Sequence, residues 1–175
     1  MPKIGKEEIN EDGKKLLKIL QQNSNHSIEH LAKNCGFTTQ KLLRIKKRLE
    51  KNNIIWGFSA VTDYKNIDLK HFTALFKRTA NPLSKEVVQD VTKGFLEDRF
   101  PEGKIIIENV LYVHGEYDWI ISFFAPDTLT MKKFCDKLIK IYGDFIASYS
   151  VHQTIIPIRK QGIKNPIAGE QGNFL

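Results

Sequence analysis

Apolar residues recur at helical spacing through the N-terminal third of the chain. Three stretches follow this pattern and predict helices over Ile9–Gln22, Ser27–Asn34 and Thr38–Lys51. The polar run Asn23-Ser24-Asn25 ends the first helix, and Gly36 lies where the second must stop and the backbone needs a left-handed residue. The pattern therefore predicts a three-helix domain whose second and third helices form a helix-turn-helix.

The segment after the third helix has the composition of β-structure. Ile54–Val61 is rich in β-branched and aromatic residues, so we predict that it forms the strands of a small wing. Trp56 and Phe58 are expected to pack into the core of this domain in preference to stacking on nucleic-acid bases. Tyr64–Leu69 is predicted to be a connector.

Strand-like and helix-like patterns then alternate in the order β-α-β-β-α-β. This order predicts a ferredoxin-like domain, in which two helices cover one face of a four-stranded antiparallel sheet, and it makes the whole chain an α+β protein. The first of these helices is expected to turn inward Val87, Val88, Val91, Phe95 and Leu96. The predicted strands are 70–78, 104–114, 117–125 and 146–158, and the predicted helices are 83–100 and 128–142.

The predicted strands are too apolar to leave the uncovered face of the sheet in water. The runs Ile105–Ile107, Val110–Leu111 and Ile120–Phe124 would expose a contiguous apolar patch. We therefore expect a homodimer that buries sheet against sheet, with higher assembly beyond the dimer.

The positive charge of the chain is concentrated near its N-terminus. The sequence has 27 Lys and Arg against 20 Asp and Glu, a formal net charge of +7. Residues 1–65 contain 13 of these cations and 7 of the acids, a net of +6, which leaves only +1 for residues 66–175. Such a distribution favours a polyanion as the partner of the N-terminal domain, since phosphate attraction supplies most nonspecific DNA affinity.

Within that domain the surplus lies on the third helix. If Leu42, Ile45 and Leu49 face inward, a basic surface remains outside, and double-stranded DNA is its natural partner; the alternative is a solvated lysine-rich face. Arginines would read guanine edges, lysines would contact mostly phosphate, and the threonines would hold a backbone phosphate at the helix start. The candidate DNA-binding residues are Thr38, Thr39, Gln40, Lys41, Arg44, Lys47, Arg48 and Lys51.

Other classes of protein are disfavoured by the composition. No apolar run approaches the roughly 18 residues that a membrane span needs, and the N-terminus lacks the apolar core of a signal peptide, so we expect a cytoplasmic protein. Cys35 and Cys135 lie in different predicted domains and are expected to be buried, reduced thiols. His26, His30 and Cys35 form only a weak metal pattern without a fourth ligand, and we predict no metal, cofactor or catalytic residue.

At this point the chain, over roughly residues 9–160, resembles the Lrp/AsnC, or feast/famine, family of transcription regulators. The resemblance rests on motifs in a characteristic order: LLKILQQN, Ser27-Ile28-x-x-Leu31-Ala32, Gly36-Phe37-Thr38, Arg48-Leu49-Glu50-x-x-x-Ile54-Ile55-x-Gly57-Phe58-x-Ala60 and Val113-His114-Gly115-Glu116-Tyr117-Asp118. It implies a DNA-binding dimer that assembles further into tetramers or octamers and responds to a small effector, often an amino acid. Effector-binding candidates carried over from the last motif are His114, Gly115, Glu116, Tyr117 and Asp118.

That last motif has a second interpretation. It can be a hairpin turn whose glycine adopts a positive φ angle and whose Asp118 bonds its own loop. The chain also departs from the family in three places. The apolar residue of Arg44–Arg48 comes one place early, Asp98–Lys104 is longer than the usual link, and His114 stands where a small hydroxyl residue is usual.

The pattern and the resemblance together predict four segments. They are a winged helix-turn-helix DNA-binding domain over 1–62, a linker over 63–69, a ferredoxin-like (RAM-type) effector-binding and oligomerisation domain over 70–160, and a tail over 161–175 that is loose unless it packs on a neighbouring subunit. Two alternatives remain beside a DNA-binding regulator. One is an Lrp-like enzyme of the siroheme decarboxylase kind, using His71, or His114 and His152 from strands that could be neighbours; the other is a metabolite-sensing partner without DNA binding.

Overall fold

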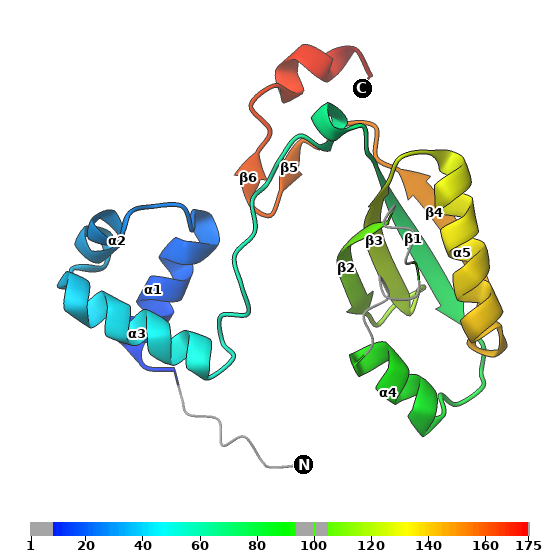
Figure 1. Cartoon of the computed structure of the whole chain (residues 1–175), viewed down its shortest axis with the longest axis horizontal. Coiled ribbons are helices and arrows are strands. Elements are labelled where there is room, and N and C mark those ends of the chain that lie inside the picture. Colours follow the sequence, from blue (N-terminus) through cyan, green and yellow to red (C-terminus); the bar gives the residue numbers. More distant parts are fainter. Residues whose placement is uncertain (1–8, 94–99, 101–104, 175) are drawn as a thin grey trace. The chain divides into compact units, whose positions relative to one another are not determined.

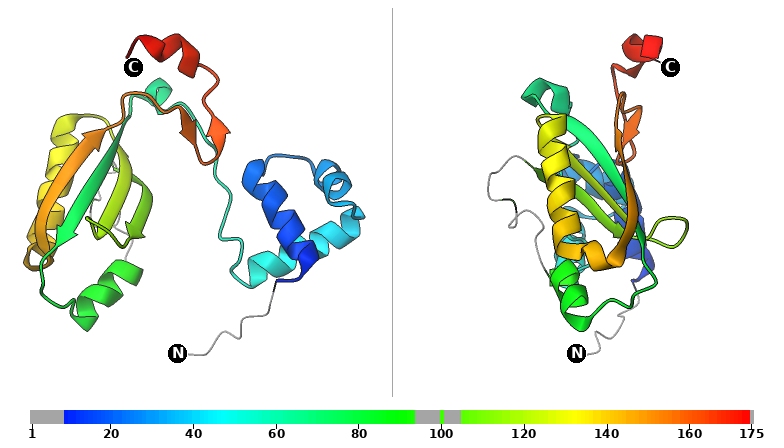
Figure 2. Two further views of the ribbon diagram at one scale, coloured as in Figure 1. Left: turned by 180° about the vertical axis from the view of Figure 1, so that it is seen from behind. Right: turned by 90° about the vertical axis from the view of Figure 1, so that its right-hand side faces the viewer.

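The chain folds into two compact units, which the computed structural model describes over residues 9–93, 100 and 105–174. The first unit joins Met1–Val61 to Pro157–Asn173, and the second comprises Thr62–Ile156. Figure 1 and Figure 2 show the helices and strands of both units. None of the helices among the described residues is both long enough and apolar enough to cross a membrane.

The first unit is built on the three predicted helices, whose ends follow from local side-chain bonds. They are α1 (Glu11–Gln22), α2 (Ile28–Cys35) and α3 (Thr39–Lys51). Ser27 and Thr38 each accept a hydrogen bond from the backbone N–H three residues on, at 3.2 Å, and so cap α2 and α3. Gly36 ends α2 in the left-handed conformation at φ 65°, as the sequence predicts.

One apolar core holds the three helices together. Each helix contributes apolar residues from one side, and the buried members of this core are Leu16, Leu20, Leu31, Ala32, Cys35, Leu42, Ile45 and Leu49. Because Leu42, Ile45 and Leu49 occupy one side of α3, the opposite side of that helix must face away from the core.

The strands predicted for the wing do not form, and this prediction is wrong. No residue of Ile54–Val61 is in a strand. The backbone N–H groups of Ile54 and Ile55 both donate to the Leu49 carbonyl, so the segment begins by capping α3. It then has no neighbouring strand among the described residues of this unit with which a ladder could be completed.

The predicted loose tail contains ordered structure. Strands β5 (Arg159–Lys160) and β6 (Ile163–Lys164) form a short hairpin, followed by the 3₁₀ helix η4 (Ala168–Phe174). The turn of the hairpin places Gln161 and Gly162 at positive φ angles. Residues 157–160, predicted to complete the ferredoxin-like domain, belong to the first unit.

The second unit has the predicted β-α-β-β-α-β order. Its four strands pair antiparallel in the spatial order β2-β3-β1-β4, the ferredoxin-like arrangement, and both helices lie on one face of the sheet (Figure 2). The elements are η1 (Tyr64–Ile67), β1 (Lys70–Arg78), α4 (Lys85–Lys93), β2 (Ile106–Tyr112), β3 (Trp119–Ala125), α5 (Thr128–Tyr142), η3 (Gly143–Phe145) and β4 (Ile146–Gln153).

The helix-covered face of the sheet carries the larger core. Phe72, Phe76 and Phe123 are buried there against Phe134 and Leu138 of α5. One prediction about its edge differs from the structure, and another is not tested. Val88 is exposed, not inward, because only Val87 and Val91 of α4 face the core, and Phe95 and Leu96 lie outside the described residues.

Strand β4 stops earlier than predicted, at Gln153 instead of Ile158. The N–H of Thr154 donates to the His71 carbonyl, one residue after the start of β1, so the partner strand ends here. Pro157, which has no N–H, then prevents a ladder from continuing.

Candidate nucleic-acid interface and ligand sites

The outward side of α3 is a cationic face. With 100° between successive residues, the positions opposite Leu42, Ile45 and Leu49 form a single strip along the helix. All of its members are exposed: Gln40, Leu43, Arg44, Lys47 and Lys51. We call these five residues the α3 face.

Two of the predicted DNA-binding cations are engaged within the domain. The Lys41 ammonium lies 2.8 Å from an Asp12 carboxylate oxygen and 4.4 Å from the centre of the Phe37 ring. Arg48 donates to the side-chain oxygen of Asn10 at 2.9 Å. Both therefore lie beside the α3 face and hold α3 against the start of α1. Arg44, Lys47 and Lys51 remain exposed to solvent.

The two predicted threonines differ in their surroundings. The Thr38 hydroxyl oxygen accepts the Lys41 N–H, which leaves its own hydrogen available to a phosphate oxygen. Thr39 is exposed at the first residue of α3, where the unpaired backbone N–H groups and the helix dipole favour an anion.

Leu43 was missed by the sequence analysis although the signal is present. It is 49% exposed at one edge of the α3 face, beside Lys47. The helical stripe that identifies Leu42, Ile45 and Leu49 as core leaves Leu43 about 100° away from it, so the same periodicity could have identified it as a contact residue.

The loop from Val113 to Asp118 joins β2 to β3 and holds the five effector candidates. His114, Gly115 and Glu116 are exposed, and the loop is closed by the N–H of Val113, which donates to the Asp118 carbonyl at 2.8 Å. Gly115 does not have a positive φ angle, and no heavy atom lies within 4 Å of the position a Cβ would take. The interpretation that a left-handed turn requires glycine here is therefore wrong.

Asp118 has a bond outside its own loop. Its carboxylate accepts the backbone N–H of Arg78 at 2.8 Å, and its own N–H donates to the Phe76 carbonyl. The carboxylate thus ties the loop to the end of β1. The hairpin interpretation, in which Asp118 bonds its own loop, does not include this contact.

A mostly buried histidine on the uncovered face of the sheet has partners that the sequence did not predict. His71 contacts Glu108 through Nε2 at 2.9 Å and Thr154 through Nδ1 at 2.6 Å, and the side chains of His71 and Glu108 are only 13% and 12% exposed. Glu108 lies where the register of β2 against β3 shifts, so a β-bulge directs its carboxylate towards β1.

Tyr64 of η1 covers this histidine. Its ring lies 5.9 Å from His71 and 5.2 Å from Phe124, and burial raises the pKa of its hydroxyl, with Asp63 and Glu108 adding to the shift. The cluster anchors the connector to the sheet. By contrast, His114 follows β2 and His152 lies on β4, the two outer strands, so the predicted neighbourhood of these histidines is wrong.

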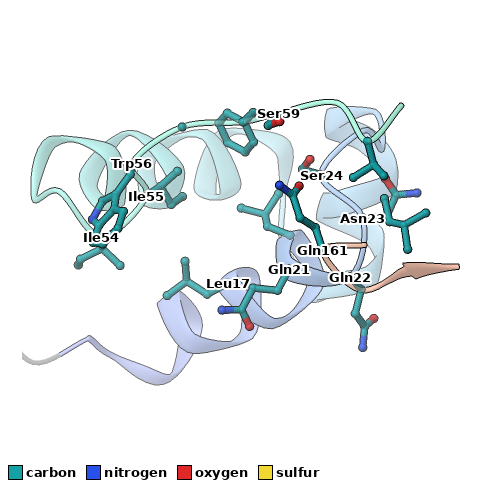
Figure 3. Close-up of a pocket in the computed structure, with 15 residues that line it drawn as sticks. Leu17, Gln21, Gln22, Asn23, Ser24, Ile54, Ile55, Trp56, Ser59 and Gln161 are labelled. Carbon is teal, nitrogen blue, oxygen red and sulfur yellow. The ribbon is translucent and has the colours of Figure 1, made fainter. Parts of the chain in front are cut away.

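A hollow of about 580 Å³ opens in the first unit between the end of α1, the segment after α3 and the C-terminal hairpin (Figure 3). Its lining includes apolar side chains such as Leu17, Leu20 and Ile54 and amide side chains such as Gln21 and Gln161. Among the residues that the structure describes, no charged residue and no residue of α3 lines it, so it is separate from the α3 face.

Trp56 lines this hollow but is not part of the core. The indole is 94% exposed and donates its N–H to the Asn53 carbonyl at 2.8 Å, while Phe58 is half-exposed beneath the Lys46 ammonium. The prediction that both rings pack into the core is wrong. With no wing strands to fold the segment back, the rings cannot reach the apolar interior.

Both cysteines are buried free thiols in the structure. Burial raises the pKa of Cys35, and it raises the pKa of Cys135 to about 12, with a smaller contribution from Asp136. Among the described residues, no three His, Cys, Asp or Glu side chains gather closely enough to hold a metal ion.

The comparisons with known proteins agree with this architecture. Residues 13–55 match a winged helix-turn-helix DNA-binding family. The transcriptional regulator AzlB of Bacillus subtilis is 27% identical over 128 residues, which cover 72% of this chain and 76% of that protein. These matches agree with the prediction of an N-terminal helix-turn-helix domain.

Solved structures extend the likeness to both units. The chain is similar to an AsnC family transcriptional regulator from Agrobacterium tumefaciens, with a TM-score of 0.62 at 22% identity over 90% of this chain and 97% of that one. It is equally similar to the transcriptional regulator NMB0573 from Neisseria meningitidis, solved with L-Met, with a TM-score of 0.62 at 17% identity over 93% and 99% of the two chains. They confirm the predicted α+β fold.

Proposed function

We propose that this chain, which has the fold of the Lrp/AsnC regulators and matches a winged helix-turn-helix family over residues 13–55, is a sequence-specific DNA-binding transcription regulator. The observation that supports the proposal most directly is the α3 face, in which exposed cations lie on the side of the helix opposite the core. On a helix-turn-helix this is the side that enters the major groove.

Each member of the α3 face has a role that follows from its chemistry. Arg44 can pair with the O6 and N7 atoms of a guanine, and Gln40 with the N6 and N7 atoms of an adenine. Leu43 lies at the edge of the face and offers an apolar surface to a thymine methyl group. Lys47 and Lys51 contact mainly phosphates, which strengthens binding to any sequence.

Phosphate contacts at the start of α3 would set its position in the groove. The exposed Thr39, the Thr38 hydroxyl and the unpaired backbone N–H groups of the first turn form a site for one phosphate. Lys41 and Arg48 contribute positive charge from the flanks while they hold α3 on α1. This division assigns base reading to three residues and positioning to the others.

The protein acts as a homodimer in this proposal, with tetramers or octamers as larger assemblies. The uncovered face of the sheet supports it, because Ile106 and Leu111 of β2 are 49% and 48% exposed on that face. Two copies would present two α3 helices to half-sites about one DNA turn, or a multiple of one turn, apart. The protein would work in the cytoplasm, with its operator.

A small effector, such as an amino acid, would modulate this activity. The solved relative from Neisseria meningitidis is a complex with L-Met, and the loop of His114, Gly115, Glu116, Tyr117 and Asp118 is the candidate contact region here. Effector binding in the second unit would shift the dimer between arrangements that differ in DNA affinity.

We propose no enzymatic activity. The comparisons are with transcription regulators, and the alternative of a siroheme decarboxylase loses its geometric support because His114 follows β2 and His152 lies on β4, the two outer strands of the sheet. His71 is occupied by Glu108 and Thr154, which anchor it in the sheet.

The proposal is tested by titrating the full chain against DNA selected from a random pool, at several salt concentrations. The affinity should fall steeply with salt, and Lys47→Gln should lower the slope of log K against log salt by about 0.9 for the lost phosphate contact. Lys133→Gln on the exposed side of α5 removes the same charge and should leave the slope unchanged. A salt-independent affinity, or equal slopes for both variants, would contradict the proposal.

A further inference from the structure

The side chain of Arg78 is held at one end of the sheet, where β1 finishes. The register of β1 against β4 shifts between Lys77 and Arg78, and such a bulge redirects the side chain that follows it. The guanidinium donates through Nη1 to the Tyr112 hydroxyl at 2.6 Å and through Nη2 to the Asn81 carbonyl at 3.0 Å. Arg78 therefore bridges the ends of β1 and β2.

The supports of this guanidinium are themselves fixed. Thr79 and Asn81 both donate side-chain hydrogen bonds to the Asp144 carbonyl, at 2.9 and 3.0 Å, which anchors the segment after β1 to η3. The Asp118 carboxylate holds the backbone N–H of Arg78. The side chain is thus positioned before any ligand arrives, and pre-organisation of this kind lowers the entropic cost of binding.

The positive charge of Arg78 has no anionic partner among the described residues. No carboxylate there lies within ion-pair distance of the guanidinium, and its Nε is buried without a hydrogen-bond acceptor. A buried N–H without an acceptor is unfavourable, more so on a charged group. Tyr112 and Asn81 are neutral partners, so they do not balance the charge, and neither accepts a hydrogen bond from the Nε–H.

We propose that Arg78 is the anchor of a binding site for a small carboxylate. The Nε–H and an N–H of the adjacent Nη group would pair with its two oxygens side by side, the geometry in which a guanidinium binds a carboxylate most strongly. This inference rests on the effector modulation proposed above, and it adds the chemical group of the ligand that is recognised. Arg78 lies on a different strand from the effector candidates in the loop before β3.

We expect a carboxylate bound by this guanidinium to displace Tyr112, whose hydroxyl accepts a hydrogen bond from Nη1. Its ring centre lies 6.0 Å from the guanidinium carbon, and the side chain is 59% exposed, so it has room to move. The ring of the buried Trp119 is 6.4 Å from that of Tyr112. Ligand binding at Arg78 should therefore change the fluorescence of Trp119.

The experiment uses the full chain with Trp56→Phe. The sequence has two tryptophans, so this substitution leaves Trp119 as the single tryptophan. This protein is titrated, at constant ionic strength, with the twenty L-amino acids, their α-keto acid counterparts and their carboxamides. We expect at least one amino acid or α-keto acid to change the Trp119 emission while its carboxamide does not. Whether the amino acid or the keto acid binds more tightly identifies the source of the carboxylate.

Variants in the same background assign the effect to one side chain. Arg78→Gln should weaken binding of the responding compound by a factor on the order of ten or more, and Arg78→Lys should weaken it less, because lysine keeps the charge but loses the paired donors. Lys77→Gln removes the same charge one residue earlier and should bind like the parent.

Two results would overturn the inference. One is the absence of any carboxylate-dependent signal across the panel, and the other is equal affinity in Arg78→Gln and Lys77→Gln. The DNA affinity of Arg78→Gln without ligand should match that of the parent, since Arg78 is not in the helix-turn-helix unit. Failure of the carboxylate site is thereby distinguished from failure of DNA binding, which the salt titration reports.

Discussion

Individual residues of α3 divide between holding the domain together and reading DNA. Leu43 gives the clearest test, because an exposed leucine contributes nothing to nonspecific phosphate attraction. If it contacts a thymine methyl, replacing that thymine with uracil in the selected site removes one buried methyl, worth roughly 0.8 kcal/mol or about fourfold in affinity.

In the Leu43→Ala variant, this thymine-to-uracil change should have little further effect, as measured by fluorescence anisotropy. Leu129→Ala, which truncates an exposed leucine on α5, should retain the full sensitivity to uracil and serves as the control. If Leu43→Ala responds to uracil as strongly as the parent does, Leu43 does not contact a thymine.

Gly36 is a residue whose backbone conformation, not its packing, determines its identity. Its φ angle is 65°, and the nearest atom to an added Cβ is the far end of Lys15 at 3.9 Å, so space is available but the conformation is strained for any other residue. Gly36→Ala should lower the free energy of unfolding by about 1 kcal/mol in urea denaturation.

Gly57→Ala is the matched control for this substitution. Gly57 has an ordinary φ angle and open space around its Cβ position, so alanine there should leave stability nearly unchanged. Equal effects at both positions would mean that the turn between α2 and α3 does not require a left-handed residue.

The residue scale also shows how far sequence reasoning reaches. Ser27, Thr38 and Gly36 were predictable because a cap or a left-handed turn depends on neighbours within four residues. The contacts of Arg78 and His71 were not, since Arg78 meets Tyr112 and His71 meets Glu108 only through strand pairing and bulges. A one-residue change of register would have sent these side chains elsewhere.

Among the elements, the helices and the central strands were predicted closely, and the boundary segments were not. β1 and α5 span the residues that their periodicity indicates, 70–78 and 128–142. The Ile54–Val61 segment has the β-propensity of a strand but lacks a partner, and β4 ends where β1 no longer offers one. Strand propensity describes how well a side chain fits into a sheet. Whether a partner strand is present depends on the tertiary structure, so propensity alone does not predict a strand.

The packing of α5 on the sheet makes a testable claim about pH. Cys135 lies in that interface, and burial raises its pKa from 9.0 to about 12. The unfolded chain loses the thiol proton first, so the contribution of Cys135 to stability is fully present below pH 9 and is lost as the pH rises towards 12.

The unfolding free energy of the parent should therefore fall faster with pH than that of Cys135→Ala between pH 9 and 11. The extra slope is at most about 1.4 kcal/mol per pH unit for one proton, measured by chemical denaturation. Other groups that titrate in this range are common to both proteins and cancel in the difference. Parallel curves would show that the thiol is not buried in the folded protein.

At the scale of the whole molecule, the two units have different proposed roles. The helix-turn-helix unit binds DNA, and the unit with the uncovered sheet face forms the dimer. The uncovered face is less apolar than the sequence analysis expected, because Ser122, Asn109 and Thr73 lie among its apolar residues. Its exposed apolar side chains gather on the outer strand β2, with Ile106 and Leu111. A dimer contact would therefore involve β2 more than the centre of the sheet.

Leu111→Lys should dissociate the proposed dimer, because it places a charge in the middle of the surface to be buried. Light scattering coupled to size-exclusion chromatography should give a monomer mass. Leu129→Lys, at a leucine that is 63% exposed on the helix side of the second unit, should remain a dimer. A dimer in both variants would mean that the contact lies elsewhere.

The oligomeric state also determines whether DNA affinity depends on the spacing between two half-sites, which a monomer cannot sense. In the dimer, two copies of α3 must meet the same face of the duplex, so affinity should rise and fall as the spacing between two half-sites is varied through one turn of about 10.5 base pairs. Leu111→Lys should bind a single half-site with the parent's salt dependence, since the α3 face is intact, but its affinity should not vary with spacing. If the variant still prefers particular spacings, either the dimer survives on DNA or β2 is not its interface, and light scattering of the complex separates the two.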